Sequence, residues 1–395
     1  ASINASVLAA SVAVAVGGYA GVGASIGVAL ARNFIGWTVA AQATTYTSGQ
    51  TGVGLNTNQT VKIASGVRQN EAYRYVGPNR TNVDLRKEDY GNQKIWKRFD
   101  LTSANSEVTA RLNGTRVNAV GDLSVTAKSN EKINADVFAG SVAAAGGLVG
   151  VALSGAGAST ENRSATNVTA EITGTTGTGV IASVILVQAM DTSVINASTG
   201  AVSISAGFGA VGVAISVGVS LAYNEIDNNI TASVHDNSGP VHSIAGNLSI
   251  LATDGATISS TTAAASVAFS VGGVAVAVSG AGASAANVIL TDTTANIVNS
   301  ADVRAKQDLI IRAATTSIVS STVAALSAAV AGGGIGVGVA IGASTATNYI
   351  GYNADGGAAA SSIKAYISGS QVIAERNLLM SATTTASIGS TVAAG

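Results

Sequence analysis

Small and large apolar residues alternate with a period of two along most of this chain. In 258–271, valine and phenylalanine alternate with small residues, and after Gly272-Gly273 valines alternate with alanines as far as Val278. A period of two predicts β-strands, and Val and Thr favour a pleated surface. A pair of glycines between two such runs predicts a hairpin turn.

This pattern recurs with a period of about 62 residues. Each unit has a glycine-centred turn, followed 14 or 15 residues later by one asparagine. The turn glycines are Gly17, Gly18, Gly146, Gly147, Gly209, Gly272, Gly273, Gly332 and Gly333, and the asparagines are Asn33, Asn162, Asn224, Asn287 and Asn348. The last four asparagines are 62, 63 and 61 residues apart, whereas the first gap is 129, about two periods. Such a period predicts stacked units that bury their apolar faces against neighbours.

An amphipathic strand that leads into each turn recurs at 122–129, 247–254, 308–315 and 377–384. Because both faces of the hairpins are apolar, both faces need covering. We therefore expect the hairpins to form a central sheet and the amphipathic strands to form outer walls. Two hairpin strands per unit, about 4.8 Å apart, predict an advance of about 10 Å per unit.

The predicted fold class is an all-β, elongated repeat array, either a β-solenoid or stacked β-hairpin layers, with one β-rich insert. The expected division is a truncated unit at 1–41, an insert lobe at 42–107, full units at 108–179, 180–244, 245–306 and 307–375, and the start of another unit at 376–395. Both ends match the same strand of the repeat, so we expect this chain to be part of a longer array.

A helical interpretation competes with this one for three long uncharged runs, Val7 to Ala31, Phe138 to Thr160 and Ala313 to Asn348. Their length suits a membrane span. Their period is two rather than 3.6, however, and a glycine pair lies near the middle of each, which disfavours a helix. Basic residues also do not flank the runs as orientation rules require.

Composition narrows the functions further. Only 10% of residues are charged and the net charge is −1, which does not favour nucleic-acid partners or anionic membranes. Cysteine is absent, so disulfides and thiolate metal sites are excluded. Only two histidines, His235 and His242, occur, which disfavours a His-rich metal site. We find no phosphate-binding loop and no nucleophile motif, and we expect neither enzymatic activity nor a cofactor.

The recurrent asparagines have two interpretations. One is a row that binds a ligand or calcium. The other is a ladder in which side-chain amides hydrogen-bond along the array at a strand end. We favour the ladder, because no Asp or Glu recurs beside the asparagines to charge a cation site.

The interval 42–107 differs in composition, with nine basic and six acidic residues. A strand is expected at 72–76, and a turn or helical loop from Asp84 should place Tyr90 near Trp96. Tyr73, Tyr75, Tyr90 and Trp96 are candidate surface or glycan contacts, since such rings stack on sugars. The alternative, which we favour, is that these rings are the core of a small packed lobe.

A motif in this insert resembles the repeat regions of giant bacterial secreted or surface proteins, of the RTX-adhesin or filamentous-haemagglutinin-like type. The matching residues are Tyr73, Arg74, Tyr75, Gly77, Asp84, Leu85, Asp89, Tyr90 and Trp96. The resemblance implies an extracellular or cell-surface, elongated β-rich protein with adhesive or structural roles. The chain lacks the glycine- and aspartate-rich calcium repeats of RTX blocks.

We therefore expect a structural or adhesive segment that forms a stalk or filament. Its partners would be neighbouring repeats or copies of itself, with cell-surface polysaccharide as a further candidate and without nucleic acid or membrane. The alternative is a membrane-embedded protein, with either glycine-packed spans or a β pore.

Overall fold

The computed structural model describes residues 1–39, 43–66, 68–92, 94–354, 357–359 and 361–395. Within these residues the fold is all-β, as predicted, with one short 3-10 helix, η1 (Leu85–Lys87), and no α-helix. The three long uncharged runs are β-strands with glycine turns. The described part of the chain contains no helix that is long and apolar enough to cross a membrane.

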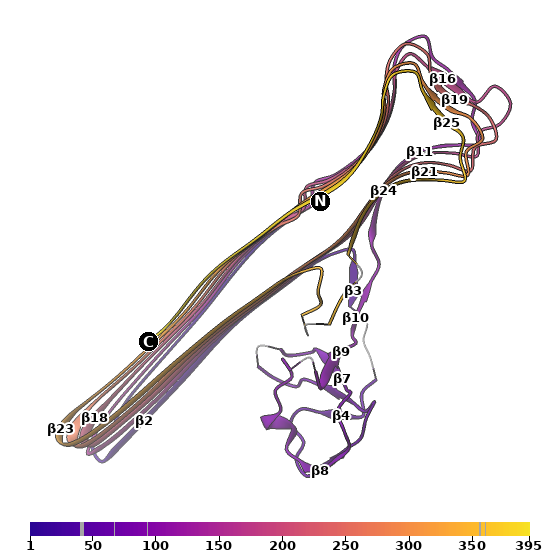
Figure 1. Ribbon diagram of the computed structural model, residues 1–395. Helices are drawn as coiled ribbons and strands as arrows, with labels where there is room; N and C mark the ends of the chain where they lie inside the picture. The colour runs from indigo at the N-terminus through magenta and orange to yellow at the C-terminus, as the bar shows by residue number, and fades with distance from the viewer. Residues whose placement is uncertain (40–42, 67, 93, 355–356, 360) are drawn as a thin grey trace.

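The longest strands form two layers that face each other (Figure 1). In each unit an outgoing stretch runs to the glycine turn and a return stretch runs back, and in three units one strand spans both. These strands are β1 (Ser2–Val16), β2 (Ala20–Ile35), β14 (Lys132–Gly146), β15 (Val149–Thr173), β18 (Val194–His235), β21 (Thr257–Val298), β23 (Leu309–Ile350) and β26 (Leu378–Ala394). We call this two-layered part, up to the turns, the fin.

At the other end the layers separate around a wider head (Figure 1). Its strands, besides the ends of the long ones, are β11 (Ser106–Asn113), β12 (Val117–Asn118), β13 (Leu123–Ser129), β16 (Val180–Ala182), β17 (Ile185–Asp191), β19 (Val241–Ser243), β20 (Leu248–Asp254), β22 (Val303–Ala305), β24 (Ser362–Ser368) and β25 (Val372–Ala374). Branched aliphatic side chains such as Ile172, Ile185 and Leu248 fill the head and are fully buried. The head therefore holds the hydrophobic core of the repeats.

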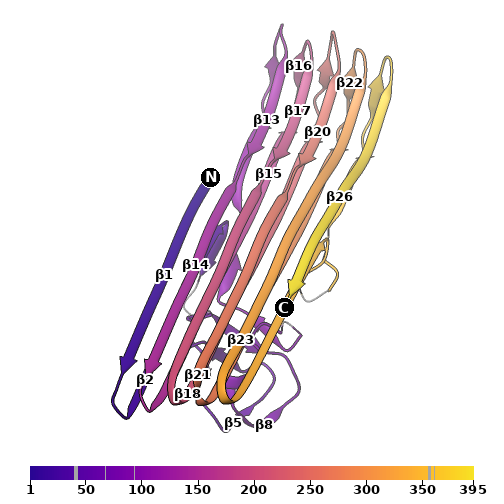
Figure 2. The same cartoon turned by 90° about the vertical axis from the view of Figure 1, so that its left-hand side faces the viewer.

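Every long strand pairs in parallel with its own counterpart in the next unit, without a change of register except at the turns. Asn224, for example, lies opposite Asn162 on one side and Asn287 on the other. The hairpins predicted from the glycine pairs are therefore wrong, because the turns connect two layers instead of two neighbours in one sheet. One strand spacing, about 4.8 Å, separates successive units, not the predicted 10 Å. Figure 2 shows the units side by side.

The two faces of each fin layer differ in side-chain size. Towards the turns, most inward positions carry Ala, Ser and Gly, whereas Val, Ile, Leu and Phe point outward. Nearer the head, branched side chains such as Ile133, Ile195 and Ile258 point inward. At Gly27 an added Cβ would lie 2.4 Å from the carbonyl oxygen of Gly140 in the facing layer, so the layers approach too closely for large inward side chains there. The amphipathic strands lie in the head, so the predicted outer walls over the fin are absent from the described structure.

The insert forms a separate lobe beside the return layer (Figure 1). Its strands are β3 (Trp37–Val39), β4 (Tyr46–Thr47), β5 (Val53–Leu55), β6 (Thr60–Lys62), β7 (Ala72–Tyr75), β8 (Arg80–Val83), β9 (Trp96–Arg98) and β10 (Leu101–Ser103). Strand β7 and helix η1 match the expected strand and helical loop.

The pairing places the lobe at 36–105 instead of the predicted 42–107. Ile35 lies opposite Ser164 and Ser106 lies opposite Thr166, so residues 36–105 occupy the position of one residue in the next unit. The predicted boundary between residues 41 and 42 lies outside the described residues. The first asparagine gap of 129 is therefore one period plus this insert, and not two periods.

Candidate functional site

The five recurrent asparagines form one continuous row inside the array. Asn33 Nδ2 donates to Asn162 Oδ1 at 2.7 Å, Asn162 to Asn224 at 2.8 Å, Asn224 to Asn287 at 2.8 Å and Asn287 to Asn348 at 2.7 Å. Every bond therefore has the same direction. Parallel, in-register pairing produces this geometry, because it places identical side chains one strand spacing apart.

The three inner members of the asparagine row lie within long strands and not at a strand end as predicted, whereas Asn33 and Asn348 lie two residues before the ends of β2 and β23. Asn162 lies inside β15, and Asn224 and Asn287 lie inside β18 and β21, and all three are fully buried. The amides are satisfied by one another, since each of the three inner asparagines both donates and accepts. The row therefore holds adjacent units in register and leaves little capacity for a ligand.

A second polar row, of serines, lies between the fin layers and was not anticipated. Ser154 Oγ donates to Ser141 Oγ at 2.9 Å, and Ser203 Oγ donates to Ser154 Oγ at 2.9 Å. The bonds alternate between outgoing and return layers and so connect the two layers as well as the units. Ser11, Ser25 and Ser216 extend this run of bonds, and a second run joins Ser266, Ser279 and Ser327. The regular spacing of these serines is a signal in the sequence, but many other serines in the chain obscure it.

The predicted turn glycines lie where the two fin layers join. Gly17, Gly18, Gly146, Gly147, Gly272, Gly273, Gly332 and Gly333 all occupy this edge. Gly333 has a φ of +150°, and an added Cβ there would lie 1.6 Å from Gly272 O. Close stacking of one turn on the next therefore requires glycine at this position.

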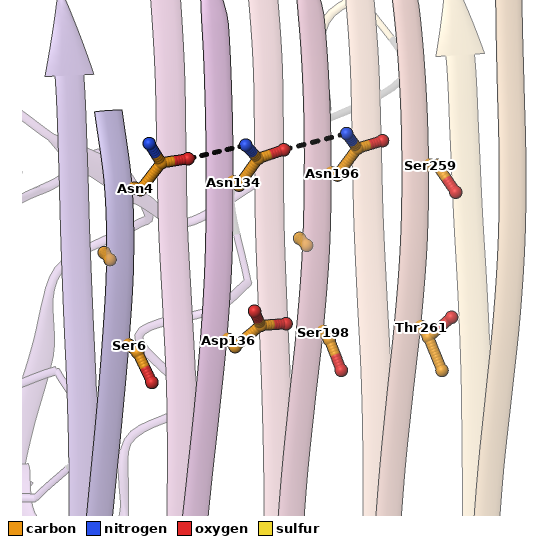
Figure 3. Close-up of a pocket in the computed structure, with 10 residues that line it drawn as sticks. Asn4, Ser6, Asn134, Asp136, Asn196, Ser198, Ser259 and Thr261 are labelled. Atoms are coloured by element: carbon orange, nitrogen blue, oxygen red, sulfur yellow. Dashed lines mark hydrogen bonds between the residues drawn. The ribbon is translucent and has the colours of Figure 1, made fainter. Parts of the chain in front are cut away.

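A third row lies on the outer face of the outgoing layer, near the head. Asn134 Nδ2 donates to Asn4 Oδ1 at 2.6 Å, and Asn196 Nδ2 donates to Asn134 Oδ1 at 2.9 Å (Figure 3). Ser259 takes the next position, and Asp136 and Ser198 lie in a parallel row. These residues line a polar depression of ≈ 560 Å³. It is a solvated stripe with a single carboxylate, and it separates the head from the apolar fin.

The four aromatic residues predicted as candidate surface contacts form the core of the lobe. Tyr73, Tyr75, Tyr90 and Trp96 are all buried, with Trp96 fully so. The ring centroids of Tyr90 and Trp96 are 4.8 Å apart, and those of Tyr75 and Trp96 are 5.0 Å apart. A stacking platform for sugars requires exposed ring faces, so the surface assignment is wrong. In the core of the lobe these rings pack together with the buried aliphatic side chains Leu55, Val61, Ile63, Val83 and Leu85.

Ion pairs join the lobe to the return layer. Arg98 of the lobe contacts Glu161 of the array, and Arg32 Nη2 lies 2.8 Å from Glu71 Oε1. Burial alone would raise the pKa of the Glu161 carboxyl, but Arg163 and Arg98 outweigh it and hold that pKa below its usual value. A cavity of ≈ 670 Å³ lies beside these groups, between lobe and array. The charges are paired across the junction, so this network fixes the lobe in place.

The outer faces of the fin are apolar and uncovered. Ile204, near the middle of the outgoing face, is 39% exposed, and Phe208 is 43% exposed. The large exposed apolar residues of this face include Leu8, Val12, Val14, Val16, Phe138, Val142, Val267, Phe269, Val271, Leu326 and Val330. On the return face they include Val22, Ile26, Leu153, Val211, Val217, Val274, Val278, Ile335, Val339 and Ile341. Contiguous apolar surface of this extent marks an interaction site.

The described residues contain no group of three or more His, Cys, Asp or Glu side chains that could hold a metal ion. His235 contacts Glu171 and Asp236, and His242 contacts Asp302. Comparisons of the chain with protein-family models, with curated proteins and with solved structures found no match.

Proposed function

We propose that this chain is a structural segment of an elongated extracellular or cell-surface protein, in which β-solenoid units stack into a stalk or filament. The observation that carries the proposal is the parallel, in-register pairing of each unit with the next, with the hydrogen-bonded asparagine row running through all five units. Such an array is stabilised mainly by contacts between neighbouring units and can extend along one axis. This architecture suits a load-bearing spacer.

The role does not require catalysis, and the residues that repeat are those that maintain the stack. Asparagine, serine and glycine recur at positions of bonding or close approach. Carboxylates such as Asp136 and Glu161 lie opposite other residue types in the next unit, with Asp191 and Asp254 as an exception. The buried rings of the lobe remove the basis for sugar stacking by Tyr73 or Trp96. We therefore assign the repeats a mechanical role. An extracellular location rests on the resemblance of the lobe motif to secreted adhesin-like proteins.

Single-molecule pulling between the chain ends tests the mechanical proposal. If units unfold one at a time, each releases about 62 residues, which is roughly 210 Å of extended chain at about 3.4 Å per residue. The lobe should give a distinct step of roughly 240 Å. Smooth extension without steps of these sizes would overturn the array function. Labelling of intact cells with antibodies against the lobe tests the location, and labelling only after permeabilisation would contradict it.

A second candidate function is membrane insertion of the fin, and one observation favours it. The outward positions between the polar rows and the turns carry no charge on either face. Nine to eleven residues per layer, at about 3.4 Å each, span about 30–37 Å, which is close to the thickness of a bilayer core. Flotation of the chain with lipid vesicles tests this candidate.

A further inference from the structure

The outer face of the outgoing layer is a flat apolar surface of defined size. It covers the outward positions from Leu8 to Val16 in the first unit and their counterparts in the other four. Nine residues at about 3.4 Å and five strands at about 4.8 Å give roughly 30 by 24 Å, or about 700 Å². A stable protein interface buries about 600–1,000 Å² on each partner, so this one face is large enough for a stable dimer.

We propose that this face docks against the same face of a second copy of the chain, outgoing layer on outgoing layer about a two-fold axis. The inference rests on the proposed structural function, because it describes how two arrays associate sideways. Side-chain rows recur at the same strand spacing on both copies, as face-to-face sheet packing requires. The polar row of Asn4, Asn134 and Asn196 borders the patch on the head side and remains in water.

The large and small side chains on this face allow it to interdigitate with the same face of a second copy. The rings of Phe208 and Phe269 pack against each other at a tilt, with centroids 5.9 Å apart. They lie beside the small outward residues Ala206 and Gly146. Large and small side chains on one face provide both the projections and the hollows that close packing of two sheets needs. A two-fold arrangement presents the projections of each copy to the hollows of the other.

The position of the lobe favours a second copy over lipid as the occupant. The lobe hangs beside the return layer, level with part of the fin, and leaves the outgoing face free (Figures 1 and 2). A bilayer surrounding both faces of the fin would have to accommodate this charged lobe. A partner on the outgoing face does not meet this obstacle.

Cysteine cross-linking tests the docking directly, because the chain has no cysteine of its own. Ile204 lies in the middle strand and the middle row of the patch, next to the expected two-fold axis. Ile204→Cys should therefore oxidise rapidly to a covalent dimer, since a disulfide needs Cβ atoms only about 4 Å apart. Ser198→Cys, six residues away in the polar row of the same strand, is the matched control and should cross-link at least tenfold more slowly.

Sedimentation equilibrium of the full chain supplies the second measurement. The wild type should dimerise, and Ile204→Lys should raise the dissociation constant at least a hundredfold, while Ser198→Lys changes it less than threefold. Ile204→Thr provides a milder variant with the same expected direction if the lysine variant misfolds. A wild type that remains monomeric at 100 µM would overturn the docking. If that monomer still unfolds in unit-sized steps under force, the array function survives without the dimer.

Two further outcomes identify a different occupant. Flotation with phosphatidylcholine vesicles that Ile204→Lys abolishes, without dimers in solution, would assign the face to lipid and refute docking. Polymers that grow equally well with Ile204→Lys would assign association to the open strand edges and would also refute it.

Discussion

Removal of one amide from the buried asparagine row should destabilise the protein far more than removal of one from the outer row. Asn224 is fully buried, accepts from Asn162 at 2.8 Å and donates to Asn287 at 2.8 Å. Asn224→Ala leaves one buried donor and one buried acceptor without partners. Each such group costs about 1–3 kcal/mol, so we expect a loss of about 2–6 kcal/mol in the free energy of unfolding.

The outer row provides the matched control. Asn196 donates to Asn134 at 2.9 Å on the half-buried outer face, where water replaces a lost partner. Asn196→Ala should therefore cost only about 0.5–1.5 kcal/mol, the net value of an ordinary hydrogen bond. Both values come from urea denaturation followed by circular dichroism, with unchanged m-values showing that the same transition is measured.

A double substitution measures the energetic coupling between neighbouring asparagines of the row. Asn224→Ala and Asn287→Ala remove a shared hydrogen bond, so the double variant should be less destabilised than the sum of the single ones by about 1–2 kcal/mol. Additive costs would show that the amides act independently. Equal costs for Asn224→Ala and Asn196→Ala would refute the reasoning about burial altogether.

Three other perturbations follow from the structure. Burial, reinforced by the charge of Asp191, raises the pKa of Asp254 to about 7. The folded state therefore retains a proton that the unfolded state loses above pH 4, and the free energy of unfolding falls as pH rises from 4 to 7. Asp254→Asn should increase the free energy of unfolding by about 2–4 kcal/mol at pH 8 and by under about 1 kcal/mol at pH 4, measured by urea titration. Gly333→Ala should cost more than about 1 kcal/mol, because its Cβ would clash with Gly272 O, and an unchanged melting temperature would contradict this. Trp96→Ala should cost the lobe about 3–5 kcal/mol and make 36–105 sensitive to protease while the array resists cleavage, whereas uniform cleavage would tie lobe and array into one folding unit.

The all-β class and the equivalence of the asparagines could be predicted from the sequence because period-two alternation and a fixed spacing are both local signals. The connection between layers could not, since a hairpin and a turn between two sheets both consist of two alternating strands with glycines between them. The pairing partner of each strand distinguishes the two connections, and that partner lies about 62 residues away in the sequence. A ladder of identical amides already implied that each strand neighbours its own counterpart, as Asn162 and Asn224 do.

The inside and outside of the fin could not be assigned from hydrophobicity either. Burial of apolar surface alone would place Val267 and Phe269 inward and Ala268 outward, yet the structure places Ala268 inside and exposes the larger pair. The closeness of the layers explains this reversal, since Gly27 has no room even for a Cβ beside Gly140. Side-chain size therefore decides which face packs, and the larger apolar side chains remain exposed.

The lobe and residues 351–361 are inserted at equivalent positions of their units. The lobe replaces the residue aligned with Ala165, and residues 351–361 occupy the place of Leu290 and Thr291 two units further on. Ala165, through its neighbour in β18, is aligned with Leu290. An insert whose ends meet at this point leaves the pairing on both sides intact, and lengthening it costs little because loop-closure entropy grows only slowly with length. These two inserts therefore lie at one place along the strands, where the fin joins the head, and the paired strands continue on both sides of it.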